Sequence, residues 1–424
     1  MKLFSLIILI LSFNSLADSE GVCGTVGIDS DKFTAYSWEV KQMCVDPYAI
    51  ICEKDNTKEN FKERTSRIMR HAAEQAGKVV YERNKFTLGR FGIDHVDEKN
   101  FRDIFKFHER ACIDDNITQC YLGQIELDPA APSWFQDDLE EQFIGEFYKA
   151  VNQELDPVID RAHEAFNLVK STLMQVVEKE LEGKVSKKKI KDVIHRLAVT
   201  KGVFSNSDKS MQLNFPFLSE LDRERIQMSY DSFCFRGVKT IENAMFYQET
   251  IKGRDFDITM FCPADYLGGV GEADSLLSVY NSMALMIAHE LGHQVNETLK
   301  NTNVFKDFNS CMEKHFSKEK LAGHSDGYSS EAQADYWAKR VIGEHLSSLK
   351  DSPPETKLEF MKETSMILCN SEDDSVHHSG RMRINRALRM TSNFMQAFNC
   401  SSRPDKDFKE SLVDCSLSGP VILP

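Results

Sequence analysis

The stretch M-A-L-M-I-A-H-E-L-G-H, residues 283–293, is the part of the sequence on which the expected fold depends. Its first six residues are apolar on every side, and a helix that is apolar all round is buried. His289 and His293 are four residues apart on this helix, so both imidazoles lie on one face and can bind one metal ion. Glu290 is offset around the helix and can reach a metal-bound water. The stretch therefore predicts a buried helix with two ligands of a catalytic zinc ion.

A second segment supplies the carboxylate that a two-histidine zinc site still needs. Residues 329–335 read S-S-E-A-Q-A-D, and the capping-box pattern of Ser330 and Gln333 predicts a helix that starts there. Glu331 and Asp335 are four residues apart and face the same way. We expect Glu331 to be the third ligand and Asp335 to hold a ligand histidine through its other ring nitrogen. The alternative is a solvated acidic helix start, which the helix dipole favours.

The H-E-x-x-H pattern has other interpretations. The pattern alone can arise by chance in a chain of this length. The zinc-protease layout with a third histidine, H-E-x-x-H-x-x-G-x-x-H, is excluded because Asn296 and Leu299 occupy the glycine and histidine positions. His315, His324 and His345 are loose ligand candidates, and each is expected to be an ordinary core or surface histidine.

Composition limits the class of protein. The chain has 424 residues, enough for two domains, and a net charge of −14, which argues against nucleic acid as a partner. A charged start, an apolar run over residues 3–13 and a small-x-small site at 15–17 predict a signal peptide over residues 1–17; an uncleaved anchor is the alternative. No later stretch is long and apolar enough to span a membrane. Eleven cysteines suit a secreted or periplasmic chain with disulfides, and their odd number leaves at least one outside intrachain pairs.

Local patterns predict several elements along the chain. Helical spacing of apolar residues is found over 59–85, 143–151, 162–176 and 190–197. Pro157 is expected to separate the second and third of these helices. Residues 243–247 and 256–260 are typical of strands, and Lys252-Gly253 between them predicts a hairpin just before the metal-binding helix.

The C-terminal motif points to a family. Residues 374–385 read D-S-V-H-H-S-G-R-M-R-I-N and are followed by Phe394 and by A-F-N-C at 397–400. This resembles the C-terminal signature of the neprilysin-like (endothelin-converting-enzyme-like) zinc peptidases, H-x-P-x-x-x-R and then E-F-x-x-A-F-x-C. N-A and F-Y within 243–247, F-C-P-A at 261–264, H-E-x-x-H and E-x-x-A-D follow the order of the family's blocks. The resemblance extends over about residues 240–415, and this chain has serine at the proline position of H-x-P.

The resemblance implies a set of roles. One zinc ion per chain would be bound by His289, His293 and Glu331, with Glu290 as the base and Asp335 holding a ligand histidine.

It also implies roles in substrate binding. His377 would donate to the oxyanion as it forms, and Arg383 would hold a substrate carbonyl. Asn243 and Ala244 would pair with the substrate backbone, as in strand addition. His378 and Arg381 nearly duplicate His377 and Arg383, so the histidine and arginine roles could be exchanged within each pair.

The resemblance further implies an α+β, mostly helical fold. A thermolysin-like catalytic domain would cover 231–424 and a helical N-terminal domain 18–230. Family members have a larger helical domain over the site, so helices around 143–177 are expected to be what remains of that roof. The implied disulfides are Cys44–Cys400, Cys52–Cys369 and Cys311–Cys415. Cys112–Cys120 is expected from proximity alone.

These observations predict a secreted or periplasmic zinc endopeptidase that cuts internal bonds of oligopeptides or flexible protein segments, with an apolar residue after the cut. The expected partner is a peptide or protein substrate. Two alternatives stay open: a zinc peptidase of another lineage with the same E-x-x-A-D block, and a zinc-binding relative that binds peptides without cleaving them. The intact Glu290 favours catalysis over the second alternative.

Overall fold

The computed structural model describes residues 39–53, 57–90, 120–121, 133–205, 207–236, 239–240, 244–262, 276–316, 326–370, 379–388, 391–400 and 413–422. By its internal contacts the chain divides into Met1–Glu39 and Val40–Pro424, and the description below concerns the second unit. The expected signal peptide, residues 1–17, lies outside the described residues.

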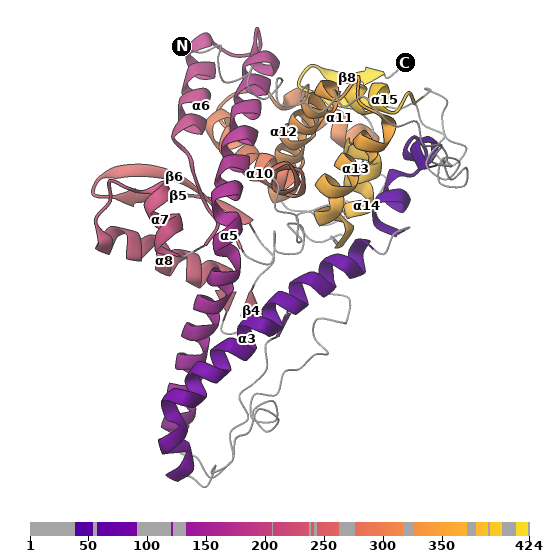
Figure 1. Cartoon of the computed structure of the whole chain (residues 1–424). Helices are drawn as coiled ribbons and strands as arrows, with labels where there is room; N and C mark the ends of the chain where they lie inside the picture. Colours follow the sequence, from indigo (N-terminus) through magenta and orange to yellow (C-terminus); the bar gives the residue numbers. More distant parts are fainter. Residues whose placement is uncertain are drawn as a thin grey trace, which may run out of the picture. The chain divides into compact units, whose positions relative to one another are not determined.

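Long helices make up the N-terminal part of this unit. After the short η1 (Ala49–Glu53) come α3 (Thr57–Arg90), α5 (Ser133–Leu181) and α6 (Lys187–Val199). α3 and the first half of α5 pack side by side (Figure 1). The helices expected over 59–85 and 190–197 are confirmed as α3 and α6.

The expected break at Pro157 is wrong, because α5 continues through it as one helix of 49 residues. A proline inside a helix removes one backbone hydrogen bond and costs about 3 kcal/mol. Apolar side chains of α5 are buried on both sides of it, including Phe147 before and Phe166 and Leu173 after. Each such burial stabilises by about 1.5–3 kcal/mol, so packing against α3 and α10 outweighs one proline.

The expected hairpin is confirmed. β5 (Ala244–Ile251) pairs antiparallel with β6 (Arg254–Phe261), and β2 (Lys201–Val203) pairs parallel with the other side of β6, which gives the order β2-β6-β5. Lys252 and Gly253 have φ of 52° and 74°, as both central residues of a type I′ turn require. β5 is therefore an edge strand among the strands that the structure describes.

Two helices cover one side of this sheet. They are α7 (Asp208–Asn214) and α8 (Glu220–Cys234), in the stretch after β2. Met211, Phe215 and Ile226 pack with sheet residues in one buried cluster. The buried Tyr230 hydroxyl lies 2.9 and 3.0 Å from the backbone carbonyl oxygens of Phe204 and Phe261, shares its one hydrogen between them, and so joins α8 to the sheet.

The remaining helices gather around α10 (Leu276–Leu299), whose residues 279–292 are all buried, as expected. Its neighbours are α12 (Asp326–Ser348), α13 (Pro354–Ser365) and α5 (Figure 1). The expected helix start at Ser330 is wrong: α12 begins at Asp326, so Glu331 lies in its second turn.

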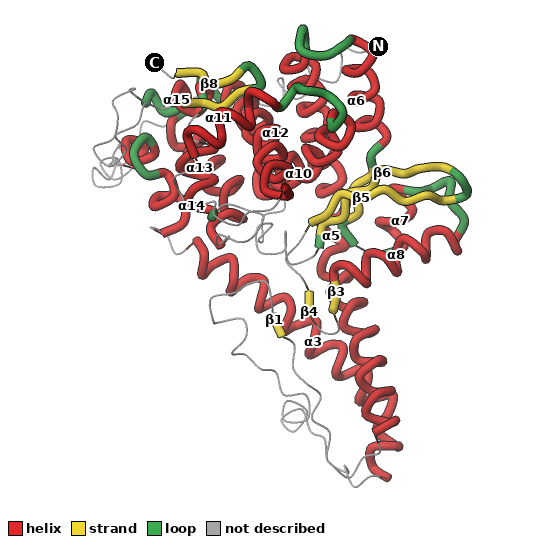
Figure 2. Tube along the Cα trace, turned by 180° about the vertical axis from the view of Figure 1, so that it is seen from behind, coloured by secondary structure: helices red, strands yellow, loops and turns green. Residues whose placement is uncertain are grey.

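Short elements complete the fold. They are α11 (Lys306–Phe316), η4 (Met366–Asn370), α14 (Gly380–Met382), η5 (Arg383–Leu388) and α15 (Ser392–Ala397), with the strands β1 (Cys120–Tyr121), β3 (Phe235–Arg236), β4 (Lys239–Thr240), β7 (Val413–Ser416) and β8 (Gly419–Ile422). Figure 2 shows how helices dominate and how short the strands are. The coarse expectation of a mostly helical α+β chain is confirmed.

Four disulfides join distant parts of the unit. Cys44–Cys400, Cys52–Cys369 and Cys311–Cys415 are the three pairs that the family resemblance implies, and they are confirmed. Cys234–Cys262, which ties the end of α8 to the end of β6, was not expected. The pairing of Cys112 with Cys120 lies outside the described residues, since Cys112 is not among them.

Within the described residues, no helix is long and apolar enough to cross a membrane. The boundary expected at 230/231 stays a prediction; across it, α5 packs directly on α10 and α12.

Candidate metal centre

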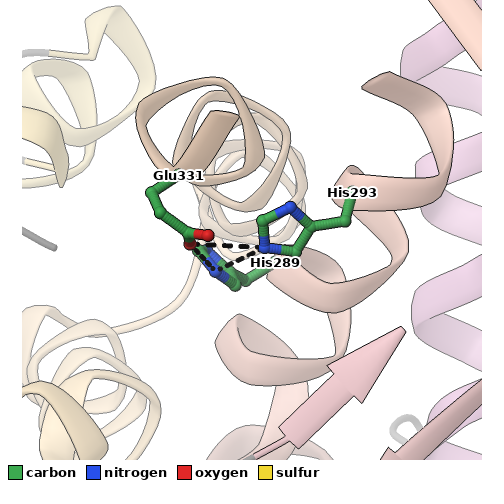
Figure 3. Close-up of side chains that lie close together, drawn as sticks. All are labelled: His289, His293 and Glu331. Carbon is green, nitrogen blue, oxygen red and sulfur yellow. Dashed lines mark hydrogen bonds and ion pairs between the residues drawn. The ribbon is translucent and has the colours of Figure 1, made fainter. Parts of the chain in front are cut away.

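The three expected ligands lie together. α10 presents His289 and His293 on one face, and α12 presents Glu331 opposite them (Figure 3). His289 Nε2 lies 3.1 Å from Glu331 Oε2 and 3.2 Å from His293 Nε2, and His293 Nε2 lies 3.3 Å from the same carboxylate oxygen. His289 is buried, and the other two are half-buried. These three residues form a group that can hold a metal ion.

The distances between the ligand atoms suit a small tetrahedral ion. Zinc binds imidazole nitrogen and carboxylate oxygen at about 2.0–2.2 Å, so two ligands of a tetrahedral site are separated by about 3.3–3.6 Å. The three observed separations, 3.1–3.3 Å, lie at or just below the lower end of this range. The donor set of two histidines and one glutamate also leaves a fourth position for water, as in catalytic zinc sites.

Asp335 and Arg383 support the first ligand. Asp335 Oδ1 lies 2.8 Å from His289 Nδ1, so Nδ1 carries a proton and Nε2 is the ring nitrogen that can bind a metal ion. Arg383 donates to both carboxylate oxygens of Asp335, through Nε at 2.9 Å and Nη2 at 2.5 Å. The expected contact of Asp335 with a ligand histidine is therefore present in the structure.

The charges around His289 are strongly coupled. Burial lowers the pKa of His289, but the hydrogen bonds that its ring donates to the carboxylates of Asp335 and Glu331 outweigh this effect and raise the pKa to about 10. Burial alone would raise the pKa of Asp335, whereas Arg383 and His289 together lower it below its usual range. In the metal-free chain a proton thus takes the place that a cation would fill.

Glu290 and a large cavity lie beside the three ligands. The cavity has a volume of about 950 Å³, and Glu290, His289, His293 and Glu331 all line it. Its other walls come from α6, β5, α10, α11 and α12. None of the described side chains of α5 lines the cavity, which differs from the expected roof around 143–177: the apolar stripe of α5 packs on α10 and α12 instead.

The edge strand β5 forms one wall of this cavity. Ala244, Phe246 and Gln248 line it at alternate positions, together with Met245. Since the outer edge of β5 is unpaired by any described strand, its backbone groups are available to an extended peptide.

Two contacts set the distance between the helices that carry the ligands. A Cβ at Gly292 would lie 3.0 Å from the carbonyl oxygen of Ala334 and 3.3 Å from Trp337, so only glycine allows α10 and α12 to approach this closely. Asn296 accepts a hydrogen bond from the Trp337 indole at 3.0 Å and donates to the Ser330 carbonyl at 3.3 Å. Asn296 therefore joins α10 to both sides of Glu331.

The two candidate arginines lie in different places. Arg383 is buried against Asp335, whereas Arg381 is exposed and pairs with Asp46 at 2.6 Å and Glu53 at 3.1 Å. Only Arg383 thus reaches the metal centre. Asn243, His377 and its alternative His378 lie outside the described residues, so their substrate contacts stay predictions, as does the contact of Arg383 with substrate.

Sequence reasoning missed a polar network beside the centre. Arg196 on α6 donates to both oxygens of the buried Asp257 on β6, at 3.0 and 2.6 Å, and to Thr298 at 3.1 Å. Gln294, the residue after His293, is fully buried and donates to Asp257 at 2.9 Å. The only local sign of this network in the sequence is Gln294 itself, a polar residue next to a ligand in a buried helix. The residues that it contacts lie far from it in the sequence.

In comparisons with known proteins, no family model matches the chain and no curated sequence is similar to it.

Proposed function

We propose that this protein is a secreted or periplasmic zinc-dependent endopeptidase, similar to the neprilysin-like peptidases and with a thermolysin-like catalytic half. One observation carries the proposal: three ligand atoms lie 3.1–3.3 Å apart beside Glu290, in a cavity bordered by a strand edge that no described strand pairs with. The spacing of the three ligand atoms suits zinc, and Glu290 suits proton transfer. The outer edge of β5 suits an extended peptide. The four disulfides fit an extracellular location.

Each residue of the metal centre has its own role in the proposed reaction. A zinc ion held by His289, His293 and Glu331 would polarise the peptide carbonyl and lower the pKa of the attacking water. Glu290 takes a proton from that water and gives it to the amide nitrogen that leaves. Asp335, fixed by Arg383, keeps His289 in the tautomer whose Nε2 can bind the ion.

Substrate contacts follow from the cavity wall. An extended substrate adds to the edge of β5 at Ala244, which holds the bond to be cut beside the metal centre. Asn243 extends the same contact, and His377 donates to the oxyanion. The substrate is an oligopeptide or a flexible protein segment with an apolar residue after the cut.

Metal analysis and a peptide-library digest test this function together. We expect about one zinc ion per chain, hydrolysis of internal bonds, loss of hydrolysis with a chelator and recovery when zinc is added. Zinc-loaded protein that binds peptides without cutting any of them would favour the non-catalytic alternative. A structure of the zinc-loaded protein with Glu331 far from the ion would contradict the ligand set.

A further inference from the structure

The cavity also has basic side chains away from the three metal ligands. Arg196, Lys300 and Lys306 line it, and outside the metal centre Glu297 is the acid of its described lining. Glu297 already forms an ion pair with Lys300. Lys306 is exposed and has no ion pair within the described residues. Arg196 is itself paired with Asp257, so among the described residues these cations exceed the acids that pair with them by one, Lys306, although the whole chain has a net charge of −14.

Arg196 is held in a fixed orientation. Asp257 and Thr298 take three of its five N–H groups. The described residues offer no hydrogen-bond acceptor to the other two, one on each terminal nitrogen, although the charges of Glu297 and Asp255 also act on this guanidinium. Its side chain is 28% exposed, and it lines the cavity. A guanidinium that is already ordered by a buried carboxylate loses little conformational freedom when it binds a second acceptor.

The register of the hairpin places this arginine along the path of the substrate. Gln248 lies opposite Asp257 in the β5–β6 ladder and also donates to it, at 3.3 Å. Gln248 is four residues from Ala244, roughly 13 Å along an extended strand. Substrate that adds antiparallel to β5 runs from the Gln248 end toward Ala244 in its own N-to-C direction. Residues before the cut thus pass Arg196.

We propose that Arg196, Lys300 and Lys306 form a subsite for a substrate carboxylate, supplied by a glutamate or aspartate roughly three to five residues before the cut. This rests on the proposed function only for the position of the cut. Arg196 gives the directed hydrogen bonds, because its fork matches a carboxylate. The two lysines add charge that attracts acidic segments to the cavity.

The test compares three forms of a ten-residue peptide that the zinc-loaded protein cuts once. They carry Glu, Gln or Lys four residues before the cut, each with a free or an amidated C-terminus. We expect kcat/KM to fall about tenfold from Glu to Lys, with Gln between them and amidation without effect. Equal values for Glu and Lys would overturn the subsite. A preference that amidation abolishes would assign the carboxylate to the C-terminus and overturn the side-chain assignment.

Variants test which residues cause the preference for the Glu peptide over the Lys peptide. Arg196→Gln should remove most of this preference. Lys306→Glu, an exposed change that does not threaten folding, should reduce it. Lys188→Glu on the exposed side of α6 makes the same charge change outside the cavity and should leave it unchanged. If Lys306→Glu and Lys188→Glu behave alike, the lysine part of the proposal is wrong.

A binding measurement separates this proposal from the proposed function. The affinity of the Glu and Lys peptides is measured with the Glu290→Gln variant, in which turnover is not required. Tighter binding of the Glu peptide supports the subsite even if the wild type hydrolyses nothing. Hydrolysis by the wild type without any difference between the peptides leaves the enzyme proposal intact and refutes the subsite.

Discussion

At the scale of single residues, the metal centre depends on a line of contacts from Arg383 through Asp335 to His289. Each contact fixes the next: the guanidinium holds both carboxylate oxygens, and the carboxylate holds Nδ1 of the imidazole. Glu290 lies outside this line. It is buried beside the ligands but touches the cavity, so its removal should leave the ligands in place.

Glu290→Gln should therefore bind zinc as the wild type does and lose turnover. The amide has the same shape but cannot accept the proton from the attacking water, so we expect kcat to fall by at least about 100-fold. Zinc content and peptide hydrolysis are measured on the same preparation. Loss of zinc from the variant would show that Glu290 acts as a ligand and would contradict its assignment as the base.

His345 predicts how stability depends on pH. Its ring is stacked on Phe360 and tilted against Tyr280, with centroids 4.3 and 5.1 Å away, and burial lowers its pKa from 6.5 to about 4. His345 takes up a proton below about pH 6.5 in the unfolded chain, but only near pH 4 in the folded chain. The contribution of the neutral ring to the free energy of unfolding is therefore complete above pH 6.5, and it is lost as the pH falls from 6.5 to about 4.

His345→Phe keeps a ring in the stack and removes the titration. Between pH 6.5 and 4, its free energy of unfolding should decline less steeply than that of the wild type, by up to about 1.4 kcal/mol per pH unit. Denaturant unfolding at several pH values measures both slopes, and metal-free protein is used so that acid release of zinc does not contribute. Parallel curves would show that His345 is charged in the folded chain.

The residues that sequence could identify are those whose partners are local or belong to a known pattern. His289 and His293 follow from one helical spacing, and Glu331 and Asp335 from another. Arg196 could not be identified, because its role depends on Asp257 and Thr298, which reach it only through the fold. The choice between Arg381 and Arg383 likewise required the structure, since both fit the motif.

At the scale of elements, the positions of the three metal ligands depend on how α10 and α12 cross. Local patterns predicted α3, α6, α10 and the β5–β6 hairpin, because apolar periodicity and turn chemistry are local. They failed at Pro157, where burial along α5 outweighs a local rule, and at Ser330, where α12 begins one turn earlier. Helix propensity is thus a weaker guide to where a helix begins or ends than the packing around it.

Gly292→Ala tests the crossing. Its Cβ would press on the Ala334 backbone, which cannot move without moving α12 and Glu331. We expect zinc affinity to fall about tenfold or more and stability by about 1–3 kcal/mol. Gly145→Ala on the exposed side of α5 is the control: nothing lies within 4 Å of its Cβ, and alanine should stabilise that helix by about 1 kcal/mol. Unchanged zinc affinity in Gly292→Ala would mean that the crossing does not position Glu331.

At the scale of the whole molecule, the start of the described chain supports the segment that carries Arg383. Asp46 accepts from Asn385 at 2.8 Å, and Asn385 accepts from the Tyr48 backbone at 2.8 Å. The disulfides Cys44–Cys400 and Cys52–Cys369 lie on either side of these contacts in the sequence. Segments more than 300 residues apart are thus joined covalently near the metal centre.

Replacing these four cysteines with serine should lower stability by about 2–5 kcal/mol for each of the two disulfides and weaken zinc binding, because the segment around Arg383 loses its support. Thermal unfolding and zinc titration measure the two effects. Peptide mapping without reductant should first recover both pairs from the wild type. A fragment in which Cys44 is paired with Cys52 would contradict both of these long-range disulfides.

The last prediction concerns access to the site. The cavity is bordered by α6, α10, α11, α12 and β5, and its lining residues Lys300, Asn303 and Lys306 are exposed, so this wall opens to solvent. α5 packs on the metal-binding helix, and none of its described side chains contributes to the wall. An extended segment of a longer chain can then lie along β5 with both ends outside the cavity.

We expect a ten-residue peptide and the same segment inside a denatured protein to be cut at similar rates, and the segment in the folded protein to be resistant. Both rates are measured at equal concentration by mass spectrometry of the products. Cleavage of the short peptide alone would mean that a cover closes over the cavity, and the open cleft would be wrong.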